Sequence, residues 1–311
     1  MLRTSIAIAV AAAFAVPASA EGLTQARWLS PEADKVAALT LSPGECLTEP
    51  ADADNAYLVE VGRAAFNSPL LMGGQAARGG LSCAACHVDG RSNPDFFLAG
   101  LSGPPGTADV TTSIFSQVRD DGEFNPVPIP TLLNAREKET FGAATRAPSL
   151  HAFISAAIVD EFQAEPPPPK VFDGLIAYIE SFDAAACPDG PTAQTARRAL
   201  NDAMRVAEAA KAAIGRGDYP TADFLLASCQ FMLGRISERF PFKKGARLRS
   251  DLAVLSRDIG QVRKAPDSAG EKFAAIEKSA ARLGKRLHKA RRISLYDPDA
   301  LKDFLKSRDR D

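Results

Sequence analysis

The chain has 311 residues, 46% hydrophobic and 24% charged, a composition that excludes disordered and fibrous classes. The net charge of −1 hides an asymmetry. Residues 21–190 carry 10 Lys and Arg against 23 Asp and Glu (−13), and residues 191–311 carry 26 against 15 (+11). This split predicts two units, either docked on each other by opposite charge or each presenting a solvated face.

The first 20 residues have the pattern of an export signal. Arg3 precedes an apolar run over residues 5–16, Pro17 follows, and Ala18-Ser19-Ala20 is a small-x-small cleavage site. At about 12 residues the run is shorter than the roughly 20 needed to span a bilayer. We expect cleavage after Ala20 and a periplasmic location, with an N-terminal anchor helix as the alternative. No other stretch approaches membrane-spanning length, so no transmembrane segment is expected.

The segment Cys83-Ala84-Ala85-Cys86-His87 has the C-x-x-C-H spacing of covalent haem attachment. Two thiols one helical turn apart can each form a thioether to the vinyl groups on one porphyrin edge. The next residue, His87, then serves as the proximal iron ligand. A zinc site, a redox dithiol and a structural disulfide are the alternatives. Zinc would need two further ligands in a chain with three histidines, so the pattern favours one haem c.

Three further cysteines remain: Cys46, Cys187 and Cys229. Cys46 and Cys187 bracket the haem motif, each beside a proline-containing loop, and an oxidising compartment favours their pairing. Cys229 lies in an apolar helical run and is expected to be a buried thiol. A Cys187–Cys229 bridge is the alternative.

Two amphipathic segments flank the motif. Residues 55–67 predict a helix with Gly62 and Phe66 on one face, and residues 171–182 predict a second helix. Its apolar stripe consists of Leu175, Tyr178, Ile179 and Phe182. The pair resembles the crossing helices of class I cytochromes c. That resemblance implies an all-α haem domain over residues 21–190, in which a proline carbonyl accepts the proximal histidine Nδ1–H; Pro104, in the loop-rich stretch after the motif, is the candidate.

Several motifs together resemble the bacterial diheme cytochrome c peroxidase family. They are G-R-A-A-F-N-S-P-L at 62–70, G-L-S-C-A-A-C-H at 80–87, I-P-T-L-L-N-A at 129–135, and the segment 141–150. The likeness covers about residues 55–185. The chain departs from the family in having one C-x-x-C-H, in having Ala144-Thr145 where the family has Asp-Gly, and in having Gly142-Ala143 where a distal ligand often lies.

The sixth iron ligand decides between electron transfer and small-molecule chemistry. His151, expected early in a helix with Pro148 in its first turn, is the distal candidate, with a surface or core histidine as the alternative. Met72 lies before the motif and is expected to be core packing. Met204 and Met232 lie on apolar faces of C-terminal helices and are expected to be core packing. His288 lies on a basic, solvated face and is a poor ligand candidate. Arg91 and Arg146 are candidates for haem propionate contacts, and a distal role for Arg146 is implied only by the family.

Residues 191–311 predict an antiparallel helical bundle. Apolar residues recur at helical spacing in two segments, with faces formed by Leu248, Leu252, Leu255, Ile259 and Val262 and by Phe273, Ile276, Ala280, Leu283 and Leu287. The positive charge of this half suits an acidic partner, an anionic surface or the acidic haem domain. A nucleic acid partner is not expected for an exported protein.

The sequence as a whole predicts an exported monohaem c-type cytochrome that transfers electrons with a redox partner protein. A peroxidase-like or small-molecule-binding haem protein with an open distal iron is the alternative. A third interpretation is a structural or sensory haem module whose basic bundle contacts a partner.

Overall fold

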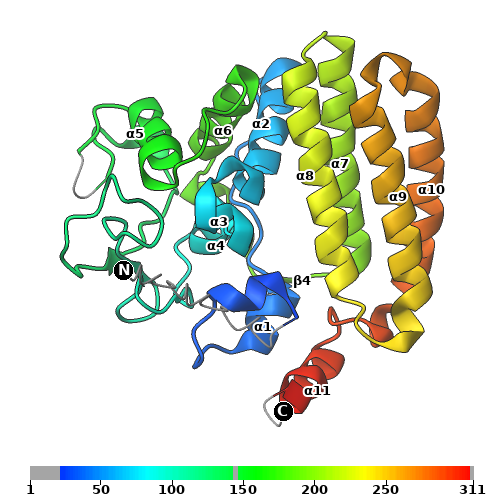
Figure 1. Ribbon diagram of the computed structural model, residues 1–311, viewed down its shortest axis with the longest axis horizontal. Helices are drawn as coiled ribbons and strands as arrows, with labels where there is room; N and C mark the ends of the chain where they lie inside the picture. The colour runs from blue at the N-terminus through cyan, green and yellow to red at the C-terminus, as the bar shows by residue number, and fades with distance from the viewer. Residues whose placement is uncertain (1–21, 143–145, 309–311) are drawn as a thin grey trace, which may run out of the picture.

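The computed structural model describes residues 22–142 and 146–308 (Figure 1). Within these ranges it contains eleven α-helices, linked by short 3₁₀ and π turns, and two small sheets with two residues in each strand. The predicted all-α class is confirmed. The predicted export signal and Ala143, Ala144 and Thr145 lie outside the described residues. None of the described helices is long and apolar enough to cross a membrane.

Helices α2 (Ala53–Phe66) and α6 (Pro169–Glu180) cross at two glycines. A Cβ atom at Gly62 would collide with the Gly174 carbonyl, and one at Gly174 would lie 2.9 Å from the Gly62 nitrogen. The two backbones therefore touch directly. Beside the crossing, three rings pack edge to face: Phe66–Tyr178 at 5.3 Å, Phe66–Phe182 at 5.9 Å and Tyr178–Phe182 at 4.8 Å between centroids.

The predicted disulfide is confirmed, because Cys46 and Cys187 are joined with an S–S distance of 2.10 Å. It lies beside the short sheet in which β1 (Leu41–Ser42) pairs antiparallel with β4 (Thr192–Ala193). The Asp183 N–H donates to the Cys46 carbonyl at 2.8 Å, which ties the end of α6 to the same corner. Cys229 is fully buried and unbridged, as expected.

Short elements and loops precede α2 and connect it to α6 along the chain. Helices α1 (Lys35–Thr40), α3 (Gly74–Gly79) and α4 (Cys83–Cys86) come before a long irregular segment that contains the hairpin of β2 (Thr107–Ala108) and β3 (Val127–Pro128). Helix α5 (Leu150–Ala156) continues into a π turn, Ala157–Glu161. The expectation that Pro148 occupies the first turn of α5 is wrong. Ser149 is the N-cap and accepts a hydrogen bond from the Ala152 N–H at 3.1 Å, so the chain turns helical only after Pro148.

The C-terminal half forms four long helices: α7 (Ala196–Gly215), α8 (Tyr219–Glu238), α9 (Ala246–Lys264) and α10 (Ala269–Lys289). We call them the four-helix unit. Each packs on the next, and α10 packs back on α7 (Figure 1). All ten residues of the two predicted apolar faces are buried. The last helix, α11 (Pro298–Arg308), leaves this unit and packs against α1, and its Leu301 shares a small core with Leu23.

The hydrophobic core continues across residue 190. One cluster of buried side chains contains residues of α2 and α6 and of all four helices of the four-helix unit. Helix α2 packs on α7 and α8, and the buried Ser228 hydroxyl of α8 donates to the Ser68 hydroxyl at 2.9 Å. The boundary at residue 190 stays a prediction, because the packing joins the two halves without a gap in the core.

Candidate functional site

The C-x-x-C-H segment forms a single helical turn, α4, which is closed at both ends by hydrogen bonds. The Ala85 N–H donates to the Ser82 carbonyl at 2.9 Å, and the His87 N–H donates to the Cys83 carbonyl at 2.9 Å. At the C-terminal end, Asn93 donates from its backbone to Cys86 and from its side chain to Ala85, at 2.9 and 2.8 Å. These bonds satisfy carbonyls that a helix end leaves unpaired. They hold the two thiols one turn apart.

The imidazole of His87 is oriented by a backbone carbonyl. Its Nδ1 lies 3.0 Å from the Pro130 carbonyl oxygen. The proline is therefore Pro130 and not Pro104, whose carbonyl accepts instead from the Thr107 hydroxyl at 2.6 Å. Burial, with Lys138 acting in the same direction, lowers the pKa of His87 to about 4, although the bond to Pro130 opposes this. At neutral pH the ring is therefore uncharged, with the proton on Nδ1 and the lone pair on Nε2.

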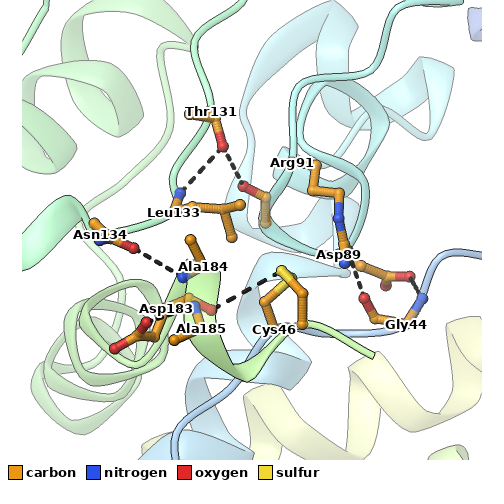
Figure 2. The surroundings of a disulfide bond; sticks show 12 residues. Gly44, Cys46, Asp89, Arg91, Thr131, Leu133, Asn134, Asp183, Ala184 and Ala185 are labelled. Carbon is orange, nitrogen blue, oxygen red and sulfur yellow. Dashed lines mark hydrogen bonds between the residues drawn. A yellow bond between two sulfur atoms is a disulfide. The ribbon is translucent and has the colours of Figure 1, made fainter. Parts of the chain in front are cut away.

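The segment that supplies Pro130 is fixed at several points. The Leu132 N–H donates to the Gly90 carbonyl, and the Asn134 N–H donates to the Phe182 carbonyl, both at 2.9 Å. The Asn134 side chain accepts from the Ala184 N–H at 2.8 Å (Figure 2). A Cβ at Gly90 would lie 2.5 Å from the Phe182 ring, and φ there is +86°, so this position needs glycine. The loop after the motif, the Pro130 segment and the end of α6 are thus locked together.

An apolar cluster packs on both motif cysteines. Its buried members include Met72, Phe96, Leu101 and Ile129, and the half-buried Phe162 packs on them. Cys83 and Cys86 are half-buried and unbridged. Burial raises the pKa of the Cys83 thiol to about 12 and moves the pKa of the Cys86 thiol in the same direction. Both side chains therefore stay uncharged and have none of the thiolate character of a redox-active C-x-x-C pair.

The structure also reveals a buried carboxyl group that sequence reasoning missed. Glu161 ends the π turn, is 7% exposed, and lies 3.6 Å from the Arg119 guanidinium. Burial raises its pKa to about 7, although Arg119 opposes this. Its charge raises the pKa of both motif thiols, which places it in their surroundings. No sequence signal marked it, because it follows an exposed aspartate in a segment without helical periodicity.

The two predicted arginines have different settings. Arg91 donates to the Gly44 carbonyl at 2.5 Å, close to where Asp89 accepts from the Gly44 N–H at 3.0 Å (Figure 2). Arg146 is exposed, with a left-handed φ of +44°, in the turn where Phe141 pairs with Ala147. Their contacts with propionates stay predictions.

The candidate sixth ligands differ in burial and in position. His151 is exposed on α5, with its ring edge-on to Phe172 at 5.5 Å, and its distal role stays a prediction. Met72 is buried in the cluster around Cys83 and Cys86, as core packing would require. Met204 and Met232 are partly buried against the main core, and His288 is exposed.

The residues present fit a covalently attached haem. Helix α4 brings together the two thiols and the neutral imidazole of His87, whose Nε2 can donate an electron pair. Apolar side chains pack around both thiols. Zinc fits less well, because among residues 22–142 and 146–308 no three His, Cys, Asp or Glu side chains converge on a shared metal position. Comparison with protein-family profiles, with curated proteins and with solved structures finds no match to this chain.

Proposed function

We propose that the chain is a c-type cytochrome that binds one haem through Cys83 and Cys86, with His87 as the proximal iron ligand. The observation that carries this proposal is the Nδ1 contact of His87 with the Pro130 carbonyl, directly after a helical turn that holds both thiols. When Nδ1 carries the proton, Nε2 is the electron-pair donor. The hydrogen bond from Nδ1–H to the Pro130 carbonyl raises the basicity of Nε2.

Each group has a defined task in this proposal. The thiols anchor one porphyrin edge, and His87 is held in one tautomer and one orientation. The apolar cluster around Cys83 and Cys86 excludes water from the site, a setting that tunes a redox centre. The haem supplies one-electron chemistry at its iron when bound. The chain then acts as an electron carrier for a redox partner in the periplasm.

Attachment can be tested by co-expression with a c-type haem maturation system. We expect haem staining of the denatured chain on a gel. The Cys83→Ala and Cys86→Ala variants should each retain one thioether, and the double variant should lose the covalent haem. Cys229→Ala is the matched control, because that thiol is buried in the four-helix unit, and it should stain like the wild type. An unstained wild type, or staining that persists in the double variant, would sink the proposal.

The identity of the sixth iron ligand distinguishes an electron carrier from a protein that binds small molecules at the iron. Ferric and ferrous optical spectra with and without carbon monoxide report it directly. Low-spin bands that ignore carbon monoxide support an electron carrier. Loss of those bands in His151→Ala, but not in Met72→Leu, identifies the histidine, and the reverse identifies the methionine that shares the cysteines' cluster. High-spin bands with ready carbon monoxide binding contradict the electron-carrier proposal.

One observation favours the second candidate, a peroxidase-like site. Glu161 is a buried carboxyl with a pKa of about 7 and an arginine 3.6 Å away, the combination expected of a general acid–base group. If the iron is open, Glu161→Gln should slow peroxide turnover at least tenfold while Glu165→Gln, an exposed neighbour, leaves it unchanged. Equal rates in both variants would remove this candidate.

A further inference from the structure

A cavity lies beside α4. It has a volume of about 410 Å³, within the range of small-molecule sites, and it separates the motif turn from helices α7 and α8. Ala84 and Ala85 form part of one wall, and Arg235 of α8 and Arg239, which directly follows this helix, form part of the other. Cys83, Cys86 and His87 themselves do not line it.

The cavity wall holds two guanidinium groups that form no direct ion pair among the described residues, although the charge of Glu238 acts on both. Arg239 is 3% exposed and donates only to neutral acceptors, the Leu295 carbonyl at 3.1 Å and the Gln25 side chain at 2.7 Å. Arg235, one turn earlier on α8, has no hydrogen-bond acceptor or ion pair among the described residues. Its guanidinium carbon lies 5.7 Å from the centroid of the Phe231 ring.

The carboxylates near the two arginines form hydrogen bonds or ion pairs with other residues. Glu238 accepts from the Thr24 N–H and hydroxyl at 3.0 and 2.7 Å. Four further acids line the cavity, and each has its own partner: Glu45 and Glu60 bind Arg63, Asp202 binds Arg205, and Asp89 binds Ser42 and Gly44. Burial lowers the pKa of Arg235 to about 10, which still leaves it cationic at neutral pH. Arg239 is the buried member of the pair, and buried charges are normally paired, yet its hydrogen-bond acceptors among the described residues are neutral.

Aromatic groups complete the cavity. Trp28, Phe231 and Tyr296 all line it. The Trp28 side chain is 8% exposed, and its indole N–H is buried without a hydrogen-bond acceptor. A ligand that fits this cavity therefore has a negatively charged head for the guanidinium groups and an apolar or aromatic body.

We propose that this cavity binds a small organic anion, a carboxylate or phosphate ester with an apolar body, through Arg235 and Arg239. Guanidinium forks match both head groups, and a bound anion would supply the ion-pair partner that the two arginines lack among the described residues. The proposal does not rest on the haem, because the two arginines and the three aromatic residues that would bind the anion lie outside the C-x-x-C-H motif.

Calorimetric titration and thermal unfolding of the purified full chain test this site. The probes are benzoate and phenyl phosphate, with neutral benzamide and sodium chloride at equal ionic strength as controls. We expect saturable binding of at least one anion and a rise in Tm of about 3 °C or more at saturation, with no such rise for benzamide or chloride. The tighter of the two anions identifies the head group.

Variants locate the site. Arg235→Gln should weaken anion binding at least tenfold, because it removes one of the two guanidinium groups that line the cavity. Arg257→Gln, on the exposed face of α9, should leave anion binding unchanged. Two outcomes overturn the proposal: anions that act no better than chloride or benzamide, and Arg235→Gln protein that binds as tightly as the wild type.

Discussion

Replacing Glu161 with glutamine should change how the stability of the chain depends on pH. The carboxyl has a pKa of about 7 in the folded chain against an ordinary value of 4.5, so the folded state holds its proton more tightly than the unfolded state. The stabilisation linked to that proton is fully present below pH 4.5 and is lost as pH rises through 7. The difference between the two pKa values corresponds to about 3 kcal/mol, of which about 2.5 kcal/mol disappears between pH 5 and pH 8.

Urea unfolding at pH 5 and pH 8 measures this effect. Glu161→Gln keeps a neutral side chain of the same shape, so the variant should gain about 2.5 kcal/mol relative to the wild type when pH is raised from 5 to 8. Glu165→Gln removes the same charge from an exposed position nearby and should show no such gain. A stability difference between wild type and Glu161→Gln that is constant across pH would refute the reasoning, since the carboxyl would then be ionised in both states at both pH values.

Two further predictions concern the frame around the site. Replacing Cys46 and Cys187 by serine opens a loop with a sequence separation of 141 residues, for which chain entropy alone predicts a stabilisation of about 5 kcal/mol. Urea unfolding should show that the free energy of unfolding falls by about 2–5 kcal/mol. Reductant should lower it equally in the wild type and should have no effect on the double variant. Gly62→Ala should destabilise the fold by more than about 3 kcal/mol, because the new Cβ collides with the Gly174 backbone. The control Gly234→Ala lies on α8 with open space around it and should be neutral or stabilise by up to about 1 kcal/mol. Equal effects of the two alanines would contradict the close crossing of α2 and α6.

Local patterns predicted much of this fold. The apolar spacing in residues 248–262 and 273–287 identified two helices whose marked residues are all buried, because helical periodicity is contained in the sequence itself. Gly62 and Phe66 were placed on one face in the same way. The pairing of Cys46 with Cys187 followed from their positions on either side of the motif and is confirmed.

Long-range contacts were the part that sequence reasoning could not supply. Pro130 lies 43 residues after His87, and nothing local distinguishes its carbonyl from that of Pro104, which is satisfied within its own turn by Thr107. The burial of Glu161 depends on a π turn and on Arg119, 42 residues away in the chain. The presence of Arg235 and Arg239 in the wall of one cavity became visible only when the side chains around them were known.

The contact between the two ends of the described chain sets the order in which the chain can complete its fold. Leu23 shares its small core with Leu295, Leu301 and Phe304, and Thr24 is bound to Glu238. The apolar surface of the first described residues is therefore covered only after the last helix has packed. A chain truncated before α11 should accordingly expose Leu23 permanently and become a target for chaperones and proteases.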